Sequence, residues 1–186
     1  MVRQRKIIVY IATSVDGFIS RSDGSVDWLD RPHPKGGYRD GMGAFYKSID
    51  TILWGRKTYD MALDFQKKGV AGASFDTKVK NYVFTRSLPQ SPAPAGVEFV
   101  SETIKAFAIR LRAEKGKNIW MMGGASIIGS FLDEGEIDEF VISVIPTFIG
   151  EGIPLIAPLR RTVPLSLISS TKFTDGVVNL HYAVRR

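Results

Sequence analysis

Residues 118–129 place the strongest constraint on the fold, because an apolar run meets two adjacent glycines and a helical pattern begins directly after them. Residues 119–122 are apolar and predict a short buried strand. Beyond Gly123 and Gly124, apolar side chains recur at helical spacing, and Gly135 is a typical helix stop. The apolar helical face consists of Ile127, Ile128, Phe131 and Leu132. The segment therefore predicts a strand that turns through glycines into a helix.

The glycine turn has the chemistry of an anion site. A helix N-terminus collects unpaired backbone N–H groups and the positive end of the helix dipole at one point. Because Gly123 and Gly124 have no Cβ, a phosphate or pyrophosphate can approach that backbone closely. A tight turn without any ligand explains the same pattern, and the spacing matches neither the P-loop nor the G-x-G-x-x-G fingerprint. The motif alone leaves both interpretations open.

The order of the expected elements predicts an α/β fold with a mixed, mostly parallel central sheet. Strands are expected over residues 6–12, 51–54, 81–84, 97–100, 119–122 and 140–145, and helices over residues 38–48, 55–65 and 103–114. Residues 13–20 contain the turn signal Asp16-Gly17 and read as a loop. Residues 165–172 and 177–184 predict a C-terminal antiparallel hairpin around Asp175-Gly176. Without a linker or repeat, residues 1–186 read as one domain.

Composition excludes several classes of function. The chain has no cysteine and only two histidines, His33 and His181, so we expect neither thiolate chemistry nor a metal site. The net charge of +6 could serve nucleic acid, but the basic residues are scattered and no aromatic residues alternate with them as a stacking platform. We therefore expect no nucleic-acid partner, and a positive field that favours small phosphorylated ligands.

The only apolar run near the N-terminus, residues 7–12, is too short for a signal peptide or a membrane span. We therefore expect a cytoplasmic protein with no membrane association.

Three of the expected strands end in residues that suit phosphate groups, at the sheet edge where α/β proteins bind ligands. The first end is followed by a glycine, two cations and a hydroxyl, the second by a guanidinium between two hydroxyls, and the third by the glycine turn. These residues are Gly55, Arg56, Lys57 and Thr58; Thr85, Arg86 and Ser87; and Gly123 and Gly124. Each set alone could be solvated surface, but an extended ligand such as a dinucleotide would use all three.

These motifs, taken in order, resemble the dihydrofolate reductase fold, a three-layer α-β-α architecture. They follow a first strand and a Ser-x-Asp-Gly loop formed by Ser14, Asp16 and Gly17. More narrowly, the chain is similar to the C-terminal reductase domain of the RibD riboflavin biosynthesis proteins, above all over residues 137–152. The resemblance spans nearly the whole chain.

The resemblance implies an oxidoreductase that uses NADPH to transfer a hydride to a small pterin- or pyrimidine-type heterocycle, as 5-amino-6-(5-phosphoribosylamino)uracil reductase does. It also implies a homodimer, for which the apolar terminal hairpin offers an edge. On this basis residues 13–22 form a mobile loop over the nicotinamide. The implied cofactor contacts are Ala12 and Ile19 at the nicotinamide, Arg56 and Thr58 at phosphates, Arg86 at the 2′-phosphate, and Gly123, Gly124, Ala125 and Ser126 at the pyrophosphate. The implied substrate contact is Ser143. Trp28 is expected either to line the cofactor or substrate cleft or only to cover the core.

The proton donor is harder to assign. In dihydrofolate reductases a carboxylate precedes the Gly-Arg motif on a helix, and Asp40 falls at about that place, with Asp27 and Asp30 as substitutes. Asp40 could equally be a solvated helix residue. Asp16 could act as an acid, but Asp-Gly is first a turn signal.

Two departures from the family patterns bear on the substrate. Val79 stands where dihydrofolate reductases usually carry an arginine for folate, and residues 62–66 lack the Ala-Asp-Asn-Pro motif typical of riboflavin-pathway reductases. The alternatives to a riboflavin-pathway reductase are dihydrofolate reductase activity and a non-catalytic nucleotide-binding protein that keeps the cleft.

Overall fold

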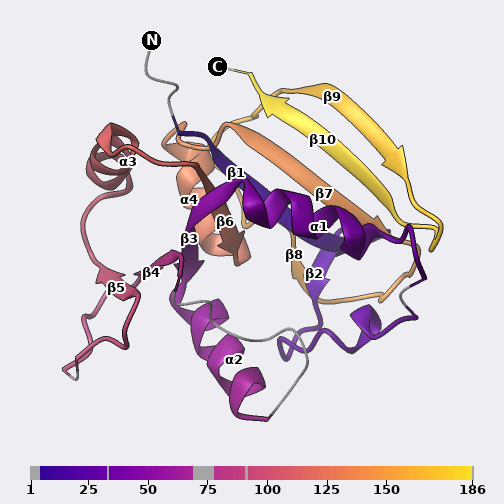
Figure 1. Cartoon of the computed structure of the whole chain (residues 1–186), viewed down its shortest axis with the longest axis horizontal. Coiled ribbons are helices and arrows are strands. Elements are labelled where there is room, and N and C mark those ends of the chain that lie inside the picture. Colours follow the sequence, from indigo (N-terminus) through magenta and orange to yellow (C-terminus); the bar gives the residue numbers. More distant parts are fainter. Residues whose placement is uncertain (1–4, 33, 69–77, 91, 186) are drawn as a thin grey trace.

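The computed structural model describes residues 5–32, 34–68, 78–90 and 92–185, and it has three layers (Figure 1). An eight-stranded sheet lies in the middle, with helices on both faces, and a small two-stranded sheet lies beside it. The strands are β1 (Ile7–Ser14), β2 (Phe18–Ser20), β3 (Ile49–Gly55), β4 (Lys80–Phe84), β5 (Val97–Val100), β6 (Asn118–Gly123), β7 (Glu139–Ile145), β8 (Ile153–Pro154), β9 (Leu165–Lys172) and β10 (Val178–Val184). The helices are the 3-10 helix η1 (Asp27–Leu29), α1 (Tyr38–Lys47), α2 (Arg56–Lys67), α3 (Ile104–Ala113) and α4 (Ala125–Asp133).

The central sheet has the strand order β5-β4-β3-β6-β1-β7-β10-β9. The first six strands of this order run parallel, whereas β10 runs antiparallel to both β7 and β9. The mixed sheet with a C-terminal hairpin is therefore confirmed. All six parallel strands end at one side of the sheet, which we call the carboxyl edge, and begin at the opposite side, the amino edge.

Apolar side chains on both faces of the sheet attach the helices. One face packs against α3 and α4 in a core that contains the fully buried Phe107 and Phe131. The other face packs against α1 and α2 through a cluster that includes Trp120 and Tyr59. Each helix thus buries one apolar stripe against the sheet, which produces the expected three-layer architecture. None of the described helices has the length and apolarity needed to cross a membrane.

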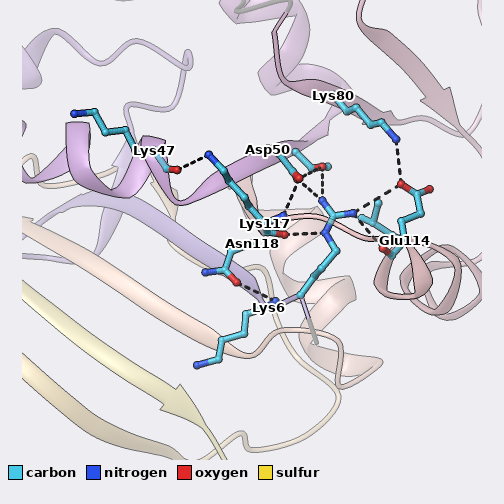
Figure 2. A network of polar contacts seen from close by, with 10 residues as sticks. Lys6, Lys47, Asp50, Lys80, Glu114, Lys117 and Asn118 are labelled. Atoms are coloured by element: carbon cyan, nitrogen blue, oxygen red, sulfur yellow. Dashed lines mark hydrogen bonds and ion pairs between the residues drawn. The ribbon is translucent and has the colours of Figure 1, made fainter. Parts of the chain in front are cut away.

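The amino edge is held together by a buried arginine. Arg5 donates to the carbonyl oxygens of Lys117 and Leu111 at 2.8 and 3.2 Å, and its guanidinium also reaches the Thr51 hydroxyl and the Asp50 carboxylate. Figure 2 shows this network and its extension through Asp50, Glu114 and Lys117. The network joins β3, α3 and the start of β6 at the side of the sheet away from the carboxyl edge.

Most of the segment expected to be a loop, residues 13–20, is paired in strands, so the expectation of a loop there was wrong. Thr13 and Ser14 belong to β1, and residues 18–20 form β2, which pairs with β8. The Asp16 carboxylate accepts the N–H of Gly150 at 2.8 Å. Because these partners lie more than 130 residues away in the sequence, local turn signals could not reveal them. Gly17 does occupy the left-handed turn conformation that the Asp-Gly signal predicts.

Candidate functional site

The three phosphate-suited strand ends lie side by side at the carboxyl edge. In the sheet register Trp54 of β3 faces Gly123 of β6, and Gly55 faces Phe84 of β4. The residues that follow these strands, 56–58, 85–87 and 124–126, therefore start from three adjacent positions. The structure brings together what the sequence separates by about 70 residues.

The glycine turn forms a close junction between β6 and α2. Gly123 has a φ of +110°, a region that side chains disfavour, and its peptide bond to Gly124 is cis. A Cβ on Gly124 would lie 3.0 Å from the Thr58 hydroxyl, and one on Gly55 would lie 3.4 Å from the Gly124 nitrogen. The turn thus presents backbone and one hydroxyl, with space that only glycine leaves open.

Two helices begin at this junction without side-chain caps. Gly55 and Gly124 are the N-cap residues of α2 and α4, and neither makes a side-chain capping hydrogen bond. By contrast, the Thr103 hydroxyl caps α3 by accepting the Ala106 N–H. The N–H groups of the first turns of α2 and α4 are therefore available to a ligand, and both helix dipoles favour an anion there.

The cations of the site differ in how firmly they are held. Arg56 donates from Nε to both oxygens of Asp60 at 2.8 and 2.9 Å, and its guanidinium lies 5.3 Å from the centre of the Phe99 ring. Lys57 and Arg86 are exposed. Arg86 makes no hydrogen bond or ion pair with the residues that the structure describes. The Arg86 guanidinium could therefore pair with an anionic ligand without breaking an existing contact, whereas Arg56 is already oriented by Asp60 and Phe99.

Hydroxyls at the second and third strand ends have distinct positions. The Thr85 hydroxyl donates to the carbonyl oxygen of Ser87 at 2.9 Å and accepts the Ser87 N–H, so it fixes the turn that carries Arg86. Ser126 is exposed in the first turn of α4, while Ala125 is buried at its start.

The next two strands supply the surface expected to meet the nicotinamide and the substrate. Ala12 of β1 faces Ser143 of β7 in the register, so the two residues lie on the same sheet face. Trp28 packs on the apolar cluster that also contacts Ala12, and it is buried. Ile19 is half-buried on β2. Ala12, Trp28 and Ser143 are thus gathered at the carboxyl edge, beside the phosphate-suited strand ends.

Three of the candidate acids, Asp40, Asp27 and Asp16, already have structural partners. Asp40 is exposed in the first turn of α1 and accepts the Gly36 N–H at 2.7 Å, and Asp27 forms a two-point pair with Arg21. Asp16 binds the 149–150 backbone, and the Ser14 hydroxyl together with these N–H groups holds the pKa of Asp16 below its usual value. This arrangement favours the turn interpretation of Asp16.

Sequence reasoning missed Tyr10, Arg31 and Asn179, which lie near Trp28 and Ser143. The Asn179 amide donates to the Tyr10 hydroxyl at 3.2 Å, and Arg31 donates to the carbonyl oxygen of Asp175. The available signal was the polar Asn179 within the otherwise apolar start of its strand. Its importance depends on a register that the sequence does not reveal.

The fold and the site define a dihydrofolate-reductase-like α/β protein. The family model described as RibD C-terminal domain matches residues 5–179, and this chain belongs to that family. The uncharacterised protein YwjB of Bacillus subtilis is 42% identical over 182 residues, which cover 96% of this chain and 98% of YwjB.

Solved structures agree with this assignment. A Shewanella sp. PV-4 protein named for riboflavin biosynthesis superposes with a TM-score of 0.83 at 30% identity, covering 97% of this chain and 99% of that one. Dihydrofolate reductase from Enterococcus faecalis, complexed with NADP(H), superposes with a TM-score of 0.62 at 16% identity, covering 98% of each chain. At that identity the second likeness shows the fold, which confirms the expected fold family.

Proposed function

We propose that this protein is an NADPH-dependent reductase that transfers a hydride to a planar heterocycle of the pyrimidine or pterin type. The observation that carries the proposal is the junction of three strand ends at the carboxyl edge. There Thr58 and the uncapped starts of α2 and α4 meet at the glycine turn, and Arg86 follows β4, the next strand beside β3. Family membership and the NADP(H) held by the related dihydrofolate reductase support the choice of cofactor.

Different residues of this chain would hold different parts of the cofactor. The N–H groups of residues 124–126 and the Thr58 hydroxyl would hold the pyrophosphate, and Arg86 would hold the 2′-phosphate that distinguishes NADPH from NADH. Ala12 and Ile19 would contact the nicotinamide. When bound, NADPH supplies the hydride. The protein contributes by holding donor and acceptor carbons in contact and excluding water.

The first test is a titration of NADPH and NADH into the purified protein, followed by energy transfer from tryptophan to nicotinamide. NADPH should bind more tightly than NADH. Arg86→Ala should weaken NADPH binding about 10- to 100-fold, because a charge-assisted contact is lost, and leave NADH binding unchanged. Arg185→Ala is the matched control, since it removes an exposed charge just beyond β10, at the amino edge. Failure of both cofactors to bind would refute the proposal.

The second test is reduction itself. NADPH oxidation should rise above background with at least one member of a pterin and pyrimidine panel. A constant background across the panel, with cofactor still bound, would instead support a non-catalytic nucleotide-binding protein.

That alternative is favoured by one observation, the use of the Asp40 carboxylate as an acceptor for the Gly36 N–H on the protein surface. If Asp40 is only structural, Asp40→Asn will leave turnover and its pH profile unchanged. If Asp40 supplies the proton, the same variant will lower turnover about 100-fold or more, the range typical of general acids.

A further inference from the structure

The turn of the terminal hairpin, between β9 and β10, holds a distant segment of the chain. This segment, residues 26–37, leads into α1, and the only regular element among its described residues is the 3-10 helix η1. Every long-range hydrogen bond of those described residues runs to Thr174 or Asp175, which we call the hairpin clamp. Figure 1 shows the chain before α1 beside this turn. The position of the segment therefore depends on the hairpin clamp.

Three hydrogen bonds join the hairpin clamp to the segment. Arg31 donates to the carbonyl oxygen of Asp175 at 3.2 Å, and the Thr174 hydroxyl donates to the carbonyl oxygen of Lys35 at 3.2 Å. The Thr174 N–H donates to the carbonyl oxygen of Gly36 at 3.4 Å. Because all three acceptors are main-chain oxygens, these contacts fix the path of the backbone.

The Asp175 carboxylate supplies a cap that the start of α1 lacks. Gly37, the N-cap residue of α1, makes no side-chain capping hydrogen bond. Asp175 Oδ2 accepts the Tyr38 N–H at 3.1 Å, while Oδ1 accepts the N–H of Val177 within the turn at 3.2 Å. A carboxylate at a helix start satisfies a free N–H group and interacts favourably with the helix dipole. One carboxylate thus joins the hairpin turn to α1.

Gly37 leaves the space that this contact needs. A Cβ at Gly37 would lie 2.8 Å from Asp175 Oδ2 and 2.9 Å from the carbonyl oxygen of Pro34. The φ of Gly37 is −73°, which suits any residue, so the close approach of these oxygens, and not the backbone conformation, requires glycine. A side chain at this position would push the Asp175 carboxylate away from α1.

The segment held by the hairpin clamp adjoins the surface expected to meet the nicotinamide. Trp28 of η1 and Tyr38 of α1 are buried in one apolar cluster with Ile145 and Val177. Ala12 of β1, the expected nicotinamide contact, packs against this cluster. Displacement of the segment would therefore move the side chains that support Ala12.

The candidate acid Asp40 depends on the same contacts. Asp40 lies in the first turn of α1, and its carboxylate accepts the Gly36 N–H. The Gly36 carbonyl oxygen in turn accepts the Thr174 N–H. Gly36 thus connects Asp40 to the hairpin clamp, which holds both the apolar cluster and this carboxylate in place.

We propose that Asp175 is a positioning residue for the nicotinamide end of the cofactor site. It acts through residues 26–37 and the start of α1, which place Trp28 and Tyr38 beside Ala12. The phosphate-suited strand ends belong to β3, β4 and β6, on the other side of β1 in the sheet, so they should not depend on Asp175. This inference rests on the proposed reductase function.

The test compares NADPH with 2′-phosphoadenosine diphosphoribose, which carries the same phosphates but no nicotinamide, by calorimetric titration. In Asp175→Ala the affinity for NADPH should fall about 10-fold, because the ring loses its fixed surface, and the affinity for the second ligand should equal that of the wild type. Gly37→Ala should produce the same difference from the other side of the contact. Asp175→Asn keeps one acceptor oxygen, so its loss for NADPH should be smaller, about 3-fold.

Asp23→Ala is the matched control. Like Asp175, Asp23 precedes a glycine with positive φ and accepts the N–H two residues ahead, here that of Ser25. Within the described part of the chain, Asp23 makes no hydrogen bond to a distant segment. Asp23→Ala should bind both ligands as the wild type does. Backbone hydrogen exchange over residues 26–40 should be faster in Asp175→Ala and unchanged in Asp23→Ala.

The possible outcomes separate this inference from the proposed function. A wild type that binds neither ligand would refute the reductase proposal. If the wild type binds both, equal losses for the two ligands, or no loss for either, would overturn the positioning role of Asp175. Unchanged hydrogen exchange in Asp175→Ala would overturn it as well. If circular dichroism shows that Asp175→Ala is unfolded, the same comparison in Gly37→Ala and Asp175→Asn decides.

Discussion

At the scale of single residues, we expect the absence of a side chain at Gly124 to be required for cofactor binding but not for folding. Its φ of −85° suits any residue, but an alanine Cβ there would lie 3.0 Å from the Thr58 hydroxyl, within the space assigned to pyrophosphate. We expect Gly124→Ala to weaken NADPH binding at least about 10-fold and to change the free energy of unfolding by less than about 1 kcal/mol. Fluorescence titration and urea denaturation would measure the two effects.

Gly43 provides the matched control for that substitution. It lies inside α1, where an added Cβ would meet no atom within 4 Å. Gly43→Ala should stabilise the protein by about 0.5–1 kcal/mol, since alanine favours the helix, and leave NADPH binding unchanged. Equal affinities in wild type and Gly124→Ala would contradict the assignment of the glycine turn to the cofactor.

Residues whose chemistry is visible locally could be predicted from the sequence, and residues defined by distant partners could not. Gly123 ends an apolar strand, and Gly124 and Arg86 lie within two residues of a strand end, so their place at the carboxyl edge could be predicted. Arg31 and Asn179 stand out only through their contacts with Asp175 and Tyr10. The contact of Asn179 with Tyr10 joins residues that are 169 positions apart in the sequence. Such long-range contacts cannot be predicted from local patterns in a single sequence.

At the scale of elements, the Arg5 network makes the amino edge a determinant of stability (Figure 2). The Arg5 side chain is 3% exposed and donates hydrogen bonds to Thr51 of β3, to Leu111 of α3 and to Lys117 directly before β6. Lysine cannot reproduce this forked set of donors, so Arg5→Lys should lower the free energy of unfolding by about 3 kcal/mol. Arg21→Lys, in an exposed pair with Asp27, should change it by less than about 1 kcal/mol. Coincident urea midpoints for the two variants would contradict this.

The junction of β1, β7 and β10 should give stability a dependence on acid pH. Burial alone would raise the pKa of Glu139, but hydrogen bonds from Lys6 and His181 outweigh it and hold that pKa below its usual value. A lowered folded-state pKa stabilises the protein above the unfolded-state pKa, and this contribution disappears as the pH falls through the folded value. Glu139→Gln should therefore cost about 1–2 kcal/mol near pH 7 and less at an acid pH below the lowered folded-state pKa of Glu139. An equal cost at both pH values would contradict the assignment.

Most elements could be predicted because apolar periodicity and glycines mark them, as in β6, α4 and the terminal hairpin. The small sheet of β2 and β8 could not be, because it consists of short segments that only pair through the fold. Residues 13–20 contain a turn at Gly17. The Asp16-Gly17 turn signal hid the end of β1 before it and β2 after it. Pairing between remote segments therefore overrode the local preference.

At the scale of the whole molecule, the sheet separates two tasks between its edges. The carboxyl edge collects glycines, uncapped helices and unpartnered polar atoms, whereas the amino edge collects paired charges such as Arg5 with Asp50 and Lys6 with Glu139. Unpaired groups lower stability, and the paired ones offset part of that loss. Substitutions at the first edge should therefore act mainly on binding, and those at the second mainly on folding.

We expect the lateral end of the sheet, at β9, to join two copies of the chain. β9 is the last strand of the sheet, and its side chains are mostly exposed, including Leu167 at 58% and Ile168 at 50%. An exposed apolar edge strand favours pairing with another chain. Light scattering after gel filtration should therefore give a dimer mass at micromolar concentration.

Leu167→Lys should yield a monomer with unchanged secondary structure, because a charge on each copy would be buried in the interface. Ile109→Lys, which alters an equally exposed apolar residue on α3, should remain dimeric. A monomeric wild type, or a dimer that persists in Leu167→Lys, would show that β9 does not form the interface.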